Sequence, residues 1–350
     1  MDIVKLRDSI KKNKIGYLIL YIFSIIYILI FKINKFILFN FYSNKFSKPI
    51  ICIGNISAGG SGKTSFVISL SEKLRSIGIN HVISLRGYKS KYKNKIIDSK
   101  KINVTDDENC SDEHKLIVLA TKNSVPVIAS YDRVFAIKYS ISKYNPSIVI
   151  MDDGFQNFKI KKDLNIVVLN LNSFNDKILP LGNLRESYSG LRRADFVVLN
   201  HCELFDEKKI EEVVSYLTKY IKKDKIIKAK YILKGFLNLI DGSYIEIEKF
   251  KGEKVSAFCG LGDNRQFKNF LEMNGLKVSL FWYFEDHHNY NIKDLISIKN
   301  LSGDLSVLTT YKDAVKFMKD AKKIFDKIYA VDIEMKYNDN IIIEEIKKFT

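Results

Sequence analysis

Short apolar runs alternate with amphipathic stretches over residues 46–228 of this chain of 350 residues. The apolar runs have the length and continuous hydrophobicity of strands buried on both faces, and they lie at residues 49–53, 81–85, 126–130, 147–151, 164–171 and 195–200. The stretches between them have helical periodicity and lie at residues 64–78, 115–122, 133–144 and 206–225. Strands that alternate with helices predict a mostly parallel sheet with helices on both faces.

The pattern changes after residue 228. Residues 229–247 read as two strands around the turn Asp241-Gly242, which we interpret as a ribbon between domains. A shorter set of strands and one helix follows, at residues 254–259, 264–275, 278–284, 304–310 and 327–333. We therefore predict two α/β/α domains with mostly parallel sheets, a larger one at residues 46–228 and a smaller one at residues 229–350.

The N-terminal segment, residues 1–45, has a different character. Residues 15–31 contain no charge, and basic residues flank them on both sides. About 20 apolar residues usually cross a bilayer, so this run is at the lower limit for a spanning helix. A signal peptide lacks support because no small-residue cleavage site follows, and a buried core helix is the remaining alternative. The aromatic-rich run with basic flanks favours a membrane-associated helix, either inserted or lying in the interface.

Charge and cysteine content narrow the picture only a little. The formal net charge is +17, from 57 Lys and Arg against 40 Asp and Glu. Such an excess suits an anionic partner, but lysines spread along the whole chain also give it without any partner. The four cysteines form no C-x-x-C pair, which excludes a zinc motif and a disulfide framework and fits a reducing compartment.

The stretch GNISAGGSGKT, residues 54–64, follows the first predicted strand and precedes the first predicted helix. It resembles the phosphate-binding loop G-x-x-x-x-G-K-[ST], except that Ser57 stands in the place of the first glycine. Gly59, Gly60 and Gly62 cluster where backbone N–H groups approach the phosphates most closely. Lys63 would then reach the β- and γ-phosphates of a nucleotide, and Thr64 would bind Mg²⁺. The larger domain is therefore expected to be of the P-loop NTPase type.

A second candidate for metal chemistry is the run SIVIMDDG, which ends in Asp152 and Asp153. A magnesium-bound nucleotide needs a carboxylate at the carboxyl end of a strand near the phosphate loop, and this run supplies two. The turn CGLGDN at residues 259–264 has two glycines but no third one and no Lys-Ser/Thr pair, so we interpret it as a tight strand–helix turn.

Seven motifs in order along the chain resemble the tetraacyldisaccharide 4'-kinase family, which phosphorylates a lipid A precursor. The family's loop has the form G-N-[LI]-[ST]-x-G-G-[ST]-G-K-T, which residues 54–64 match, Ser57 included. The other six are RGY (86–88), SDEH (111–114), DRV (132–134), DDGFQN (152–157), LPLGNLRES (179–187) and FEDHH (284–288). The departures lie beside the charged positions, with Leu85, Ser111, His114, Asn157, Asn183 and Ser187 replacing the family's usual residues.

The resemblance implies roles for individual residues. ATP would be held by Gly54, Asn55, Ser57, Gly59, Gly60, Ser61, Gly62, Lys63 and Thr64. Thr64, Asp152, Asp153 and Glu186 would surround Mg²⁺ and the phosphates. Asp112 would be the base for the sugar hydroxyl, with His287 as its helper, although His288 remains an alternative; Lys63 would act with them in catalysis. Tyr88, Arg86, Arg133, Arg185 and Gln156 are candidates for the substrate side of the site, where guanidinium groups suit phosphate oxygens.

The predicted activity is transfer of the γ-phosphate of ATP to the 4'-hydroxyl of a tetraacylated glucosamine disaccharide 1-phosphate, at the cytoplasmic face of the bacterial inner membrane. The expected partners are the lipid substrate and the membrane surface, with neither nucleic acid nor an obligate protein partner. One alternative is a P-loop phosphotransferase or GTPase with a soluble substrate, although the chain has no N-K-x-D motif. The other is a non-enzymatic protein that binds polyanions or anionic lipid.

Overall fold

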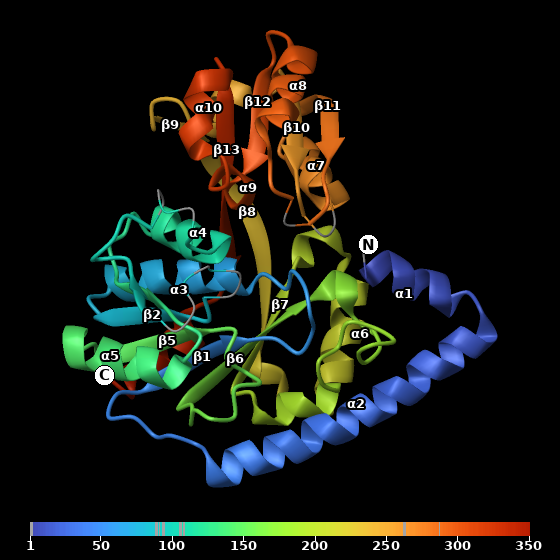
Figure 1. Cartoon of the computed structure of the whole chain (residues 1–350), viewed down its shortest axis with the longest axis vertical. Helices are drawn as coiled ribbons and strands as arrows, with labels where there is room; N and C mark the ends of the chain where they lie inside the picture. Colours follow the sequence, from blue (N-terminus) through green and yellow to red (C-terminus); the bar gives the residue numbers. More distant parts are fainter. Residues whose placement is uncertain are drawn as a thin grey trace.

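The structure is a computed structural model and describes residues 3–87, 90, 92, 95–104, 107, 109–261, 264–286 and 288–350. Its described residues form two α/β domains, one above the other in Figure 1, with a long helix along one side of the lower domain. One continuous sheet of 13 strands runs through both domains. The predicted fold class, two α/β domains with mostly parallel strands and an N-terminal apolar helix, is confirmed.

The first domain is built on the strands β1 (Ile50–Gly54), β2 (His81–Leu85), β3 (Ile97–Asp98), β4 (Val127–Ala129), β5 (Ile148–Asp152), β6 (Leu164–Asn170) and β7 (Phe196–Asn200). Its helices are α3 (Lys63–Ser76), α4 (Asp112–Ala120), α5 (Arg133–Tyr144) and α6 (Glu207–Leu217). The strand order is β7-β6-β1-β5-β2-β4-β3, and all neighbours are parallel except β3 and β4. The strand that precedes the phosphate loop, β1, is therefore central, and β5 lies directly beside it.

Alternation along β1 explains why helices cover both faces of this sheet. Ile51 and Ile53 belong to one apolar core, together with side chains of α3, while Ile50 and Cys52 belong to a second core with side chains of α6. All four side chains are fully buried. Successive side chains of a strand point to opposite faces, so a run of apolar residues requires cover on each side.

The second domain contains β9 (Tyr244–Ile245), β10 (Lys254–Cys259), β11 (Lys277–Tyr283), β12 (Ser306–Thr310) and the upper part of β13 (Ile328–Tyr337). Its helices are α7 (Asn264–Met273), α8 (Ile292–Ser302), α9 (Tyr311–Ala314) and α10 (Met318–Ile324). The strands β11, β10, β12 and β13 are parallel, and two apolar cores lie against this part of the sheet.

The connection between the domains differs from the predicted hairpin. The strand β8 (Ile226–Asn238) begins beside β7 and continues into the second domain, where it pairs with the short strand β9 around the predicted turn. Its main antiparallel partner is β13, from Tyr329 opposite Asn238 to Tyr337 opposite Ala229. The ribbon between the domains therefore joins segments about 100 residues apart, a pairing that local sequence patterns do not reveal.

The strand β13 and the helix after it also change the predicted domain boundary. After β13 the chain returns to the first domain, where Met335 of β13 and Ile342, Ile343 and Ile346 of α11 (Asn340–Lys347) complete the core around α3. The prediction that all of residues 229–350 form the second domain is therefore wrong for the last part of the chain. Two strand crossings, rather than one linker, connect the two domains.

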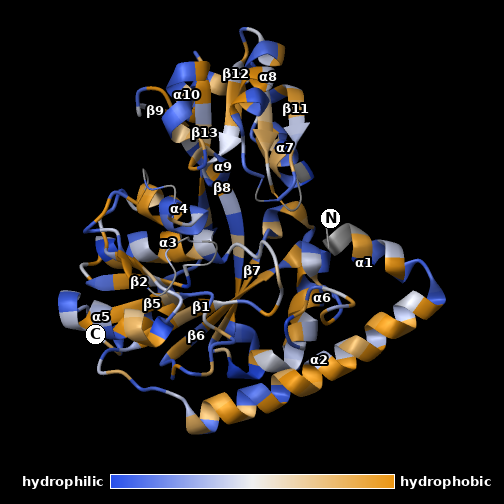
Figure 2. Cartoon of the chain, viewed as in Figure 1, coloured by the Kyte–Doolittle hydropathy of each residue, from blue (hydrophilic) through white to orange (hydrophobic). Residues whose placement is uncertain are grey.

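The N-terminal segment forms α1 (Ile3–Lys11) and the long helix α2 (Lys14–Phe41). Figure 2 shows α2 as a largely hydrophobic helix on the outside of the first domain. Large apolar side chains are exposed along it, among them Ile19, Ile22, Phe23, Ile26, Leu29, Ile30 and Ile33. The helix has 28 residues and its most apolar 18-residue window has a mean hydropathy of 2.2, so it has the length and composition of a membrane-crossing helix. The buried-core alternative is wrong, because only 6% of its most apolar window is buried.

Candidate functional site

The phosphate-binding loop lies between the carboxyl end of β1 and the amino end of α3. Gly62 is the residue before α3 and has a φ of +86°, and no side chain caps this end of the helix. The free N–H groups of a helix's first turn attract anions. Asn55 braces the loop from inside, since its amide donates to Ser57 O (2.6 Å) and to Ser61 Oγ (3.1 Å).

Two asparagines from neighbouring strands hold the loop from the other side. Asn170, the last residue of β6, donates to Gly60 O at 3.0 Å, and Asn200, the last residue of β7, donates to Ser61 O at 3.2 Å. The sequence analysis missed both residues. The strands predicted at residues 164–171 and 195–200 include both asparagines, but an asparagine near the end of a strand does not by itself indicate a contact with the loop.

Asp153 lies beside the P-loop lysine. Lys63 Nζ is 3.5 Å from Asp153 Oδ1, and Arg185 Nη1 is 3.0 Å from the same oxygen. Burial on its own would raise the pKa of Asp153, but the positive charges of Lys63 and Arg185 outweigh it and hold the pKa below its usual value. Lys63, Asp153 and Arg185, predicted from three separate motifs, are thus brought together.

Asp152, at the end of β5, is buried and has a carboxylate oxygen, Oδ1, without a hydrogen-bond partner in the part of the chain that the structure describes. Burial raises the pKa of Asp152 to about 7, and the nearby Glu113 carboxylate adds to the effect. A buried oxygen of this kind suits Mg²⁺ or water bound to Mg²⁺, because both satisfy it and favour its charged form. Thr64 stands in the first turn of α3.

The described residues contain no group of three or more His, Cys, Asp or Glu side chains arranged to hold a metal on their own. A magnesium ion at Asp152 and Thr64 would therefore take its remaining ligands from phosphate oxygens and water, which is usual for Mg²⁺ with a nucleotide. The donor set fits a metal that arrives with its nucleotide.

Arg133 occupies a different position from the one expected for a substrate contact. Its guanidinium is buried beneath the carboxyl ends of β2 and β5, where Nη2 donates to Ser84 O (3.2 Å) and to Asp152 O (2.7 Å). Direct contact with a substrate phosphate requires exposure, so the geometry favours a bracing role for Arg133 under Asp152. Its charge helps to keep the Asp152 carboxylate ionised.

Glu186 also makes contacts that the sequence did not suggest. Its two carboxylate oxygens lie 3.0 and 2.8 Å from Arg193 Nη2, and the Gln156 amide donates to Oε1 at 2.8 Å. Gln156 in turn donates to Asn55 O at 2.7 Å. The Arg193 ion pair thus connects through Gln156 to the base of the phosphate loop. The metal-ligand role of Glu186 stays a prediction, and its carboxylate is engaged elsewhere in this structure.

The amino end of α4 faces the phosphate loop and carries Asp112 and Glu113. Ser111 caps this helix, since its hydroxyl accepts from the His114 N–H at 3.4 Å. Glu113 is exposed as a residue, but the surrounding protein removes water from around its carboxylate and raises its pKa. The charge of Lys63 opposes that rise. The sequence analysis chose Asp112 and gave Glu113 no role, yet Glu113 is electrostatically coupled to Lys63, Asp152 and Asp153.

Of the two adjacent histidines of the second domain, the structure describes only His288. His288 Nε2 lies 2.9 Å from Asp294 Oδ2, and its ring packs against Phe284 and Tyr290. His288 therefore supports the start of α8 rather than facing the first domain freely. His287 and Tyr88 lie outside the described residues, so their predicted roles stay predictions. Arg86 follows β2 and is exposed at the carboxyl edge of the sheet.

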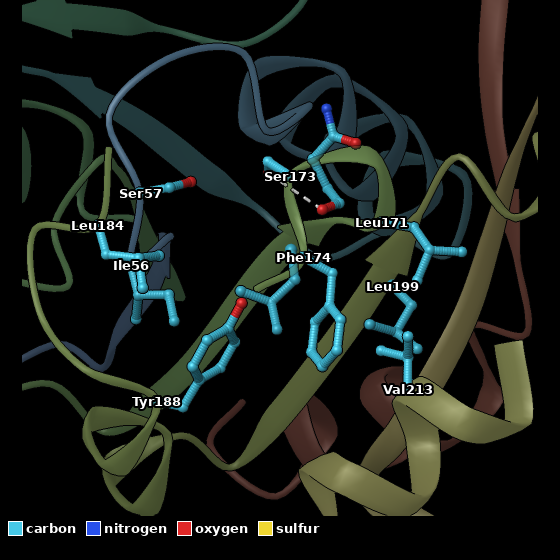
Figure 3. A pocket seen from close by; sticks show the side chains of 11 residues that line it. Ile56, Ser57, Leu171, Ser173, Phe174, Leu184, Tyr188, Leu199 and Val213 are labelled. Carbon is cyan, nitrogen blue, oxygen red and sulfur yellow. Dashed lines mark hydrogen bonds between the residues drawn. The ribbon is translucent and has the colours of Figure 1, made fainter. Parts of the chain in front are cut away.

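Two hollows lie in the part of the chain that the structure describes, and the smaller one adjoins the phosphate loop. Figure 3 shows the smaller, about 10 Å³, with Ile56 and Ser57 on one side and Phe174, Leu199 and Val213 on the other. A space of this size holds about one water molecule, so it is a packing void rather than a ligand site. The larger hollow, of about 700 Å³, is lined by Asn172, Glu203, Leu204 and Phe205 of the first domain and by Arg265, Gln266, Asn269 and Met273 of α7.

Comparison with known proteins assigns the chain to a family. The model of the tetraacyldisaccharide-1-P 4'-kinase family matches residues 17–349. The tetraacyldisaccharide 4'-kinase of Elusimicrobium minutum is 32% identical over 96% of this chain and 92% of its own length. That of Halothermothrix orenii is 33% identical over 95% of this chain and 92% of its own length. A crystal structure of LpxK from Aquifex aeolicus in complex with ATP superposes with a TM-score of 0.75 at 29% identity, covering 98% of this chain and 99% of that chain. Since the match extends over nearly the whole chain and includes the phosphate loop described above, the chain belongs to the tetraacyldisaccharide-1-P 4'-kinase family of kinases.

Proposed function

We propose that this protein transfers the γ-phosphate of ATP to the 4'-hydroxyl of a tetraacylated glucosamine disaccharide 1-phosphate, a late step of lipid A biosynthesis. The observation that carries the proposal is the convergence of three elements at one edge of the sheet. The phosphate loop follows β1, the Asp152–Asp153 pair ends the adjacent strand β5, and the first turn of α4 brings two carboxylates toward Lys63. A kinase needs a phosphate cradle, a metal carboxylate and a base for the acceptor hydroxyl in this relation.

The donor side is assigned as follows. Backbone N–H groups of the loop and Lys63 bind the triphosphate, and Thr64 and Asp152 hold Mg²⁺, which neutralises charge on the phosphates when bound. Asp153 keeps Lys63 and Arg185 in place, since its carboxylate contacts both. The hollow of about 700 Å³ beside Asn172, Glu203 and α7 is large enough for a nucleoside, and we assign the base and ribose to it.

The acceptor side lies between the domains. Asp112 takes the proton of the 4'-hydroxyl, with His287 of the second domain as its helper. In a loose phosphoryl-transfer transition state most catalysis comes from positioning and charge neutralisation, so the main requirement on Asp112 is to be held beside the hydroxyl. Arg86 and Arg185 supply positive charge near the phosphates, and Tyr88 contacts the substrate. Closure of the second domain over α4 excludes water before transfer.

The lipid substrate is reached through α2, which we place in the cytoplasmic interface of the bacterial inner membrane. One side of α2 is held by the first domain, with Ser24 Oγ donating to Ile178 O (3.1 Å), Tyr27 OH to Arg185 O (3.0 Å), and Phe31 packing edge-on against Phe158. A helix fixed along its middle to a globular domain cannot also thread a bilayer there, so the exposed apolar side favours lying in the membrane surface. The contact to Arg185 O joins the membrane helix to the catalytic edge.

The proposal is tested with the full chain in mixed micelles, labelled ATP, Mg²⁺ and the disaccharide 1-phosphate lipid. The expected product carries a second phosphate, and its formation stops when Mg²⁺ is removed. Transfer to a soluble sugar but not to the lipid would favour a different phosphotransferase. Salt-dependent binding to polyanions without any ATP turnover would instead favour a non-enzymatic role.

A further inference from the structure

One lysine of the second domain, Lys312, makes an ion pair near the domain boundary and has no place in the mechanism described above. Lys312 is in α9, and its Nζ is 2.7 Å from Asp286 Oδ1, in the segment of residues 284–286. The helix α9 packs against α4 of the first domain. Lys312 also acts electrostatically on Glu113, in the first turn of α4. A cation of the second domain is thus paired with a carboxylate of its own domain, on a helix that packs against the helix carrying Glu113.

The backbone around Lys312 is held firmly by its neighbour. Asp313 is fully buried, and its Oδ2 accepts from the Gly260 N–H (3.0 Å) and from Thr310 Oγ1 (2.8 Å). Its other oxygen, Oδ1, forms a buried ion pair with Lys316 Nζ at 3.0 Å. A Cβ added at Gly260 would lie 3.2 Å from Asp313 Oδ1 and 3.0 Å from Glu285 O, so this turn lies close to both Asp313 and the segment of residues 284–286. The turn at Gly260 and the segment of residues 284–286 therefore lie against the start of α9.

The charges explain why a lysine is required at this position. Glu113 is coupled to Asp112, Asp153 and Asp152, so the first turn of α4 lies in an acidic environment. Asp286 of the second domain adds another carboxylate, which is paired with Lys312 of α9. Without an intervening cation, carboxylates on the two domains repel each other as the domains approach.

From this arrangement we propose that Lys312 is a positioning residue, which bridges Asp286 and the first turn of α4 and so aligns the segment of residues 284–286 with the acceptor site. This inference rests on the proposed function, because the position of residues 284–286 affects activity only if these residues serve the transfer to the sugar hydroxyl. Asp313 fixes the backbone from which Lys312 reaches out, and Asp286 is its partner within the second domain.

Steady-state kinetics of the full chain in mixed micelles test the bridge. For Lys312→Ala we expect kcat to fall about tenfold, which corresponds to about 1.4 kcal/mol of transition-state stabilisation. The KM for ATP should stay within about twofold, since Lys312 does not touch the phosphate loop. Lys312→Arg should restore most of kcat because it keeps the charge. The matched control is Lys323→Ala, whose ammonium pairs with Asp320 of its own helix (3.2 Å), and it should leave kcat unchanged.

A double-mutant cycle with Asp286→Asn adds a second criterion, since two residues in one bridge give effects that do not add. Wild-type kcat in Lys312→Ala, or failure of Lys312→Arg to restore it in a variant with the wild-type melting temperature, would overturn the proposal. Carbodiimide crosslinking followed by mass spectrometry gives a readout that does not depend on activity. It should join Lys312 to Glu113 or Asp112 as well as to Asp286, and a product with Asp286 alone would refute the interdomain bridge. If the wild-type chain does not phosphorylate the lipid, the proposed function fails, while the crosslink still decides the bridge.

Discussion

Replacing Gly62 by alanine tests whether the phosphate loop has the geometry described here. Gly62 has a φ of +86°, and an added Cβ would lie 2.1 Å from Asn200 Nδ2 and 2.8 Å from Tyr231 OH. The left-handed backbone costs about 1–2 kcal/mol for an alanine. Crowding a packed site costs about 1–3 kcal/mol more, because Asn200 must leave its bond to Ser61 O. We therefore expect a loss of about 3 kcal/mol in the free energy of unfolding, the sum of the two effects.

Two other glycines of the same loop separate these effects. Gly59 has a φ of +103° but nothing within 4 Å of an added Cβ, so Gly59→Ala should show only the backbone cost, about 1–2 kcal/mol. Gly60 has open space and no positive φ, so Gly60→Ala should leave the unfolding free energy nearly unchanged. The double variant Gly62→Ala/Asn200→Ala should recover part of the crowding cost, although Tyr231 still lies close.

Thermal unfolding without nucleotide measures this series. For a domain of about 200 residues, 1 kcal/mol corresponds to about 2–4 °C, so Gly62→Ala should melt at least about 6 °C below wild type. Titration with ATP should show weakened binding in the same variant, since the free N–H groups of α3 are displaced. Equal melting temperatures for Gly62→Ala and Gly60→Ala would refute the reasoning, because the two sites differ only in the features that the structure assigns to Gly62.

Three further predictions follow from the site and its supports. Asp112→Asn should lower turnover by about 10²–10⁴-fold while ATP binding stays within about twofold, and a matching loss of ATP binding would contradict its role as base. Burial lowers the pKa of His114 to about 4, so the folded state holds it neutral, and the unfolding free energy should fall as the pH drops below about 6.5, by about 3 kcal/mol in all near pH 4. Melting curves between pH 7.5 and 5 should show a shallower pH dependence for His114→Gln, with His81 titrating in both proteins, and identical slopes would exclude His114 as a source. Tyr27→Phe, compared with Tyr21→Phe at an exposed position of the same helix, should remove about 1 kcal/mol of attachment and speed hydrogen exchange in residues 178–185, and unchanged exchange would show that this bond does not hold the loop.

Local patterns predicted most of the catalytic edge. The strand before the phosphate loop, the helix after it and the aspartates at the end of β5 each depend on their own short stretch of neighbouring residues. The convergence of Lys63, Asp153 and Arg185 followed from the rule that parallel strands present their carboxyl ends at one edge, together with the family's motifs. Glu113, Asn170 and Asn200 were missed because a carboxylate beside a predicted base, or an asparagine ending a strand, has no distinct local signature.

The contacts that could not be predicted from the sequence are those between segments distant along the chain. Arg133 is buried beneath Asp152 because β2 and β5 lie side by side and both offer it a backbone carbonyl. The pairing of Glu186 with Arg193 depends on how the chain turns after Glu186. Both side chains carry the charge expected of a phosphate or metal contact. Charge is a property of the residue, whereas its partner is set by packing, so the sequence assigned the chemistry of these positions but not their neighbours.

The sequence by itself determined the alternating α/β pattern, the nucleotide loop, the aspartate pair and the apolar N-terminal helix, because each depends on hydrophobic periodicity or on spacing within a short segment. Only the tertiary structure decided that β13 pairs with β8, that α11 returns to the first core, and that Lys312 pairs with Asp286 on a helix packed against α4. These are long-range arrangements in which many side chains pack at once, and no short stretch of sequence encodes which distant surface completes it.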